Sequence, residues 1–142
     1  MARYEFSKKG YVNSDEILRG DLITVEADEI GGILAVKAKL SNSQLRAFYN
    51  EVKALETKIG DKVENFPKNY PMILMMKSKA AYKKGSQSSK IPLEFKDFID
   101  ENIDLIKKRN GEGKGKQAFD NFVIFFEAVV GYFYGHGGKG NR

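Results

Sequence analysis

Residues Phe119 to Tyr134 have the sequence FDNFVIFFEAVVGYFY, the most apolar stretch of the chain. Phe and Val recur in it every three or four residues, and further apolar side chains cover most of the remaining positions. A helix with this pattern is buried on several sides. The rest of the 142 residues shows no strand-type alternation of useful length and no internal repeat. We therefore predict an all-α fold, a compact bundle of four to five helices with this helix at its centre.

Among the other predicted helices, the one that begins after Ser41 has the clearest start signals. Ser41 and Gln44 have the spacing of a capping box, in which each side chain satisfies a backbone N–H of the first turn. Leu40 and Leu45 occupy the two positions of a hydrophobic staple. Apolar residues then recur every three or four positions as far as Ile59, directly before Gly60. The sequence therefore predicts a helix between these two signals.

Two prolines are each expected to open a further helix, because proline suits the first helical position. Pro71 precedes a helix over residues 72–84, and Pro92 opens another. The residues expected to face inward in the first are Met72, Ile73, Met75, Met76 and Ala80. The second has an apolar stripe of Phe95, Phe98, Ile99, Ile103 and Ile106, and a water-facing side of Asp97, Asp100, Glu101, Asp104 and Lys107.

The ends of the chain lack such patterns. We expect residues 1–20 to be a loosely ordered N-terminal arm and residues 135–142 to be a flexible, glycine-rich tail, with the helical bundle domain over 21–134. Residues 21–38 have helical spacing that Gly31 and Gly32 weaken. Residues 110–115 are expected to form a flexible connector.

The residue inventory argues against an enzyme. The chain has no Cys and a single histidine, His136, in a glycine-rich tail, so we predict no metal site, no cofactor and no catalytic triad. The glycine-rich runs lack the spacing of a phosphate-binding loop. The chain has neither a signal-peptide pattern nor an apolar run of the roughly 20 residues that span a bilayer, so a cytoplasmic protein is expected.

Charge is distributed unevenly along the chain. Residues 1–36 carry four basic and seven acidic residues, whereas residues 37–142 carry twenty and twelve. Between Asn65 and Leu93 there is no Asp or Glu but there are six lysines. Lysine neutralises phosphate without exact geometry, so this window favours sequence-independent contact with a nucleic-acid backbone. The alternative is a solvated helix end, but the helix dipole accounts only for the last two lysines.

The candidate RNA contacts derived from this window lie mainly on one predicted helix. Helical spacing places its lysines on two adjoining faces, and a tyrosine among them is able to stack on a base. Two basic residues on the polar face of the capped helix extend the patch. These candidates are Lys77, Lys79, Tyr82, Lys83, Lys84, Arg46 and Lys53.

Three blocks, in this order and spacing, resemble the small helical subunit of the type III-A CRISPR–Cas effector, the Csm complex. They are Leu40 to Arg46 with Glu51 and Val52, Met72 to Gly85, and Phe122 to Tyr132 with Gly137, Gly138 and Lys139. Together they span residues 40–139, whereas residues before 38 match poorly. The resemblance implies an α-helical, non-catalytic subunit that contacts the crRNA–target RNA duplex and neighbouring Csm subunits, and that self-associates as stacked copies or as a homodimer in isolation. It carries basic contact positions onto Arg46, Lys77, Lys79 and Lys139.

Two hypotheses about function therefore stand side by side. In the first, the chain is an RNA-binding subunit of the type III-A interference complex and takes part in antiviral defence. In the second, it is an assembly or scaffold protein that acts through helix-face stacking, with the acidic face at Asp97, Asp100, Glu101 and Asp104 as one contact surface.

Overall fold

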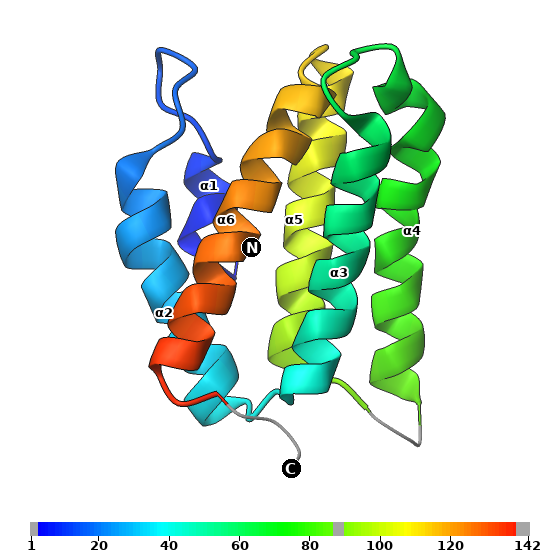
Figure 1. Cartoon of the computed structure of the whole chain (residues 1–142). Coiled ribbons are helices and arrows are strands. Elements are labelled where there is room, and N and C mark those ends of the chain that lie inside the picture. The colour runs from blue at the N-terminus through cyan, green and yellow to red at the C-terminus, as the bar shows by residue number, and fades with distance from the viewer. Residues whose placement is uncertain (1–2, 87–89, 139–142) are drawn as a thin grey trace.

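The computed structural model describes residues 3–86 and 90–138. Over these ranges it consists of helices, with one isolated bridge between Val12 and Leu18, so the predicted all-α bundle is confirmed. In chain order the elements are α1 (Glu5–Lys9), the π-helical η1 (Leu22–Glu26), α2 (Ala27–Gly32), the π-helical η2 (Ile33–Lys37), α3 (Asn42–Ile59), α4 (Asn65–Gly85), α5 (Leu93–Gly111) and α6 (Gly115–Gly135). Figure 1 shows α3 to α6 running side by side, with α1 and α2 on the opposite side of α6 from α3.

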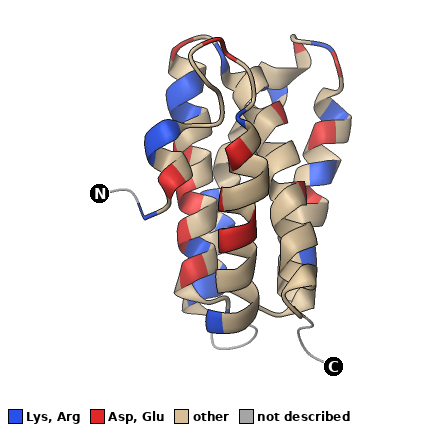
Figure 2. Ribbon diagram, turned by 90° about the vertical axis from the view of Figure 1, so that its left-hand side faces the viewer, with Lys and Arg blue, Asp and Glu red and all other residues tan. Residues whose placement is uncertain are grey.

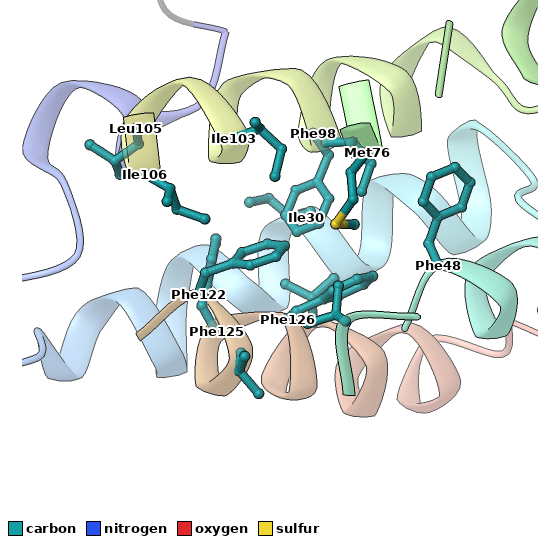
Figure 3. Close-up of a cluster of buried hydrophobic side chains, with 14 of the residues drawn as sticks. Ile30, Phe48, Met76, Phe98, Ile103, Leu105, Ile106, Phe122, Phe125 and Phe126 are labelled. Atoms are coloured by element: carbon teal, nitrogen blue, oxygen red, sulfur yellow. The ribbon is translucent and has the colours of Figure 1, made fainter. Parts of the chain in front are cut away.

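Helix α6 is the central element, as its sequence predicts. It packs against α2, α3 and α5. The centroid of the Phe126 ring lies 5.5 Å from that of Phe98 of α5 (Figure 3) and 5.6 Å from that of Tyr49 of α3. Aromatic rings at such separations add to the free energy gained by burying their area. An aromatic cluster that draws on three helices therefore forms the core.

Helix α3 begins and ends where the sequence predicts. The Ser41 hydroxyl accepts a hydrogen bond from the Gln44 backbone N–H, and the Gln44 side chain accepts one from the Ser41 N–H, over 3.1 and 3.2 Å. Leu40 and Leu45 of the staple are both buried, and Gly60 ends the helix.

Helix α4 begins at Asn65, seven residues before the predicted start at Met72, so that Pro71 lies inside it. The position of Pro71 costs one intrahelical hydrogen bond, to the Pro67 carbonyl. Pro67 and Pro71 are both exposed, so water is able to reach the Pro67 carbonyl. The prediction that Met72 and Met75 face inward is wrong: they are 46% and 47% exposed. Because α4 packs mainly against α3 and α5, it has a narrow buried stripe, made of Phe66, Ile73, Met76 and Ala80.

The N-terminal arm, residues 3–20 of the structure, differs from the expected loosely ordered segment. Phe6 of α1 is fully buried, with its ring 5.1 Å from Phe125 of α6. The Tyr11 hydroxyl donates to the buried Asn102 side chain over 2.6 Å, and burial raises the pKa of Tyr11 well above its ordinary value. Aromatic anchors in a short helix and an irregular segment leave no periodic signal in the sequence, which is why the pattern analysis missed this packing.

Gly31 explains the close approach of α2 to α6. A Cβ built on it would lie 2.8 Å from the Phe133 backbone nitrogen, so only glycine fits between the two helices. Gly31 and Gly32 lie within the continuous helical run that η1, α2 and η2 form, and do not interrupt it. The His136 ring lies next to Gly32, and its Nε2 is 2.6 Å from Asp28 Oδ1, a contact that links the end of α6 to α2.

Candidate nucleic-acid interface

The structure spreads the predicted RNA-contacting residues over three sides of the bundle. Lys79, Tyr82 and Lys83 line the side of α4 that faces α3. Lys77 faces α5, and Lys53 faces α6. Lys139 lies outside the described residues. The lysine-rich window is therefore not one continuous surface.

Two lysines in the middle of α4 are neutralised by carboxylates from the neighbouring helices. Lys77 Nζ lies 2.7 Å from Asp104 Oδ1 of α5. Lys79 Nζ donates hydrogen bonds to both carboxylate oxygens of Glu51 in α3, and its distance to Oε2 is 2.7 Å. A sequence window without acids is therefore not free of acids in space. Figure 2, viewed from the side of α1 and α2, shows Lys and Arg next to Asp and Glu on several helices of the bundle.

The two basic residues of α3 are also engaged within the chain. Lys53 Nζ lies 2.8 Å from Glu56 and 3.9 Å from Glu127 of α6, and the hydrogen bond to Glu56 is the main reason why its pKa is raised. The Arg46 guanidinium lies over the Tyr49 ring, 5.6 Å from its centroid. Arg46 stays exposed, and among the described residues no carboxylate pairs with it. Of these two, Arg46 keeps more of its charge available to an outside anion.

The C-terminal end of α4 differs from its middle. Lys83 and Lys84 have no ion pair with any residue that the structure describes. Next to them Tyr82 is 74% exposed, the largest exposure of any large hydrophobic residue in the described ranges. An exposed ring beside unpaired ammonium groups is an arrangement that stacks a base and holds a phosphate. We call Tyr82, Lys83 and Lys84 the α4 end.

A cavity of about 350 Å³ lies beside the α4 end, between α3 and α4. Its walls include Ala47 and Phe48 of α3, with Lys79, Tyr82 and Lys83 on the other side. A smaller hollow of about 190 Å³ continues past Lys83 toward Ile91. The charge pattern of the sequence does not reveal this groove or the carboxylate of Glu51 within it. The helical spacing of Ala47 and Glu51, one turn apart on the face toward α4, is the signal that could have found them.

The acidic face of α5 is largely occupied by contacts within the chain. Asp97 pairs with Arg3 over 3.3 Å and Asp100 with Lys96 over 2.5 Å, while Asp104 holds Lys77. The Glu101 carboxylate accepts hydrogen bonds from the backbone at the start of the arm. Few of these charges remain for head-to-tail stacking, which weakens the scaffold hypothesis in its original form.

A sequence model of the Csm2 Type III-A family matches residues 18–139. The chain belongs to this family. It is therefore a small subunit of the type III-A CRISPR effector, the Csm complex, and the predicted family is confirmed. The match begins at residue 18, whereas the first of the three sequence blocks begins at Leu40, and it leaves most of the arm outside it. Comparisons with curated proteins and with solved structures give no match.

Csm2 proteins are structural subunits of the Csm complex. In the described part of this Csm2 chain, no group of three or more His, Cys, Asp or Glu residues is placed to hold a metal ion. Within the same ranges, no helix combines the length and the apolar character needed to cross a membrane.

Proposed function

We propose that this chain is a non-catalytic, RNA-binding subunit of the type III-A ribonucleoprotein, and that the α4 end contacts the crRNA–target RNA duplex. The observation that carries this proposal is the exposed Tyr82 ring beside the ammonium groups of Lys83 and Lys84, which have no ion pair with any described residue. Arg46 adds a further cation on α3. The site residues Lys53, Lys77 and Lys79 contribute less, because carboxylates of the chain already pair with them.

The mechanism is electrostatic and does not read sequence. Each lysine that replaces a condensed counterion on the RNA backbone adds to affinity through the release of that ion. Tyr82 offers a π-face that any base is able to stack on. The chain thereby holds the RNA in place while its helix faces contact other Csm subunits and further copies of itself in the inner filament, in the cytoplasm.

Binding of single-stranded RNA to the purified chain tests this proposal. We expect roughly micromolar, sequence-tolerant binding that weakens steeply as salt rises from about 50 to 300 mM. Measured by fluorescence anisotropy, homopolymeric and mixed sequences should give similar affinities. Binding that does not change over this salt range would contradict the proposed mechanism.

The assembly alternative is separated by a pull-down with the other Csm subunits after nuclease treatment. Loss of the chain from the complex when RNA is digested supports RNA-mediated attachment. Retention of the chain, together with salt-insensitive RNA binding, would favour helix-face stacking as its main role.

A further inference from the structure

A second basic site lies at the other end of the bundle from the α4 end. It is a cavity of about 510 Å³ between the N-terminal arm and the hairpin of α5 and α6. In Figure 1 this end carries the loop of the arm and the α5–α6 connection, whereas α4 ends at the opposite end. The volume falls in the range of roughly 300–1,000 Å³ that is typical of small-molecule sites. We call it the arm cavity.

The walls of the arm cavity are fixed by contacts on both sides. On the arm, the Arg19 guanidinium donates to the Gly10 carbonyl over 3.0 and 2.8 Å. On the hairpin, Arg109 and Lys114 lie 2.6 and 2.9 Å from the Glu16 carboxylate, which anchors the loop of the arm. Glu16 adopts a φ of 63°, unusual for a residue with a side chain, and these two ion pairs hold it there. The cavity is therefore formed before any ligand enters.

The lining is predominantly cationic, and two of its charges are unpaired. Five basic side chains line the cavity, against two carboxylates. Arg19 and Arg109 are engaged by acids, and Lys9 lies 3.6 Å from Glu5. Lys8 of α1 and Lys108 of α5, in contrast, have no ion pair with any described residue, and both are exposed. Two ammonium groups from separate elements thus lie at one cavity without a counter-charge of their own.

The remaining walls complement these charges. Gln117 accepts a hydrogen bond from Arg109 through Oε1 over 3.1 Å, which leaves its amide NH₂ as a donor, and Asn121 adds a second amide. Val12, Leu105 and Ala118 supply apolar surface. Flexible ammonium groups, neutral donors and an apolar wall are the combination that holds a phosphate together with its organic part.

We propose that the arm cavity binds a phosphate group, either of a free nucleotide or of an RNA chain. Lys8 and Lys108 bind the phosphate oxygens, and the amides of Gln117 and Asn121 donate further hydrogen bonds. Lys8 lies outside residues 18–139, so the family match does not account for this site. The inference does not depend on the α4 end.

Calorimetry on the full chain tests the proposal with three probes: inorganic phosphate, ATP without magnesium, and a single-stranded uridine oligomer. The variant Lys8→Ala/Lys108→Ala removes the two unpaired charges. Its matched control is Lys58→Ala/Lys62→Ala, which makes the same change in net charge with exposed lysines that do not line the cavity. A third variant, Lys83→Ala/Lys84→Ala, reports on the α4 end alone.

We expect the affinity for ATP to fall at least about tenfold from the wild-type chain to Lys8→Ala/Lys108→Ala, because two charge-assisted contacts are lost. The Lys58→Ala/Lys62→Ala control should bind ATP as the wild type does, and the side-chain amide signals of Gln117 and Asn121 should shift in NMR spectra of the wild-type chain when ATP is added. If only the RNA oligomer loses affinity in Lys8→Ala/Lys108→Ala, the site stands and RNA is its phosphate source. If no probe binds, or if every probe binds this variant and the control equally, the proposal is overturned.

Discussion

Helices α6 and α4 have the same length, 21 residues, but their environments are opposite. α6 packs against α2, α3 and α5 and is buried on most of its surface, whereas α4 lies at the edge of the bundle and packs mainly against α3 and α5. For α6, the apolar residues alone predict its place. For α4, the same kind of pattern placed Met72 and Met75 in the core, although they face solvent. It also placed Lys77 and Lys79 on a free surface, although carboxylates of neighbouring helices pair with them. Sequence pattern thus describes a helix well when the environment is uniform around it, and poorly when it changes from side to side.

The largest effect should come from the centre of α6. Phe126→Ala should lower the free energy of unfolding by about 3–5 kcal/mol, because it leaves a cavity among rings from three helices. Met75→Ala on the outer face of α4 is the matched control and should change it by less than about 0.5 kcal/mol. Urea denaturation followed by circular dichroism measures both. Equal losses in the two variants would remove the contrast between an inner and an edge helix.

Two helical glycines, Gly31 of α2 and Gly131 of α6, test the same contrast between a packed and an open position. Gly31→Ala should destabilise the fold by about 1–3 kcal/mol, because the new methyl group meets the α6 backbone. Gly131→Ala, in α6 itself, has nothing within 4 Å of its added Cβ and should stabilise the helix by about 0.5–1 kcal/mol. Thermal denaturation of both variants checks the opposite signs, and a loss at Gly131 similar to that at Gly31 would refute the packing argument.

The pairing of the α4 lysines is open to a double-mutant cycle. Lys79 and Glu51 are partly exposed, so their coupling energy should be about 0.2–1 kcal/mol and should fall as salt rises. The cycle uses Lys79→Ala, Glu51→Ala and the double variant in urea denaturation. A coupling of zero at low salt would mean that Lys79 remains available to RNA, contrary to the structure.

The smallest effect is local, at the arm. Hydrogen bonds from Lys114 and Arg109 lower the pKa of the Glu16 carboxyl below its ordinary value of 4.5. A lowered folded-state pKa means that the ionised carboxylate stabilises the docked arm above that value and stops doing so as pH falls through the folded pKa. The protection factors of the Asn13 and Arg19 amides, both hydrogen-bonded in the arm, should therefore fall as the pH drops below 4.5 and the carboxylate takes up its proton. Glu16→Gln should show faster exchange at neutral pH and no such step.

Local sequence signals predicted most of the bundle. The Ser41–Gln44 capping box, the end at Gly60 and the stripe of α6 depend on neighbours within a few residues, so they can be recognised without coordinates. The arm could not be predicted, because isolated aromatic rings anchor it against helices that lie about 90 to 120 residues away in sequence.

The candidate site was predicted only in part. Three residues of the window keep their predicted character: Tyr82 is exposed, and Lys83 and Lys84 have no ion pair with the residues that the structure describes. The partners of Lys77 and Lys79 lie 27 and 28 residues away on other helices, so no property of the window itself reveals them. Composition gives the net charge of a segment, but the packing of helices decides which charges meet.

The salt dependence of RNA binding in two double variants tests the central claim most directly, namely that RNA contact belongs to the end of α4 and not to its middle. Each variant, Lys83→Ala/Lys84→Ala and Lys77→Ala/Lys79→Ala, removes two positive charges from the same helix. We predict that the first lowers affinity and reduces the slope of log K against log salt by about two, one for each lost phosphate contact, while the second leaves the slope nearly unchanged. Equal slopes for the two variants, or a larger loss from the second, would contradict the account.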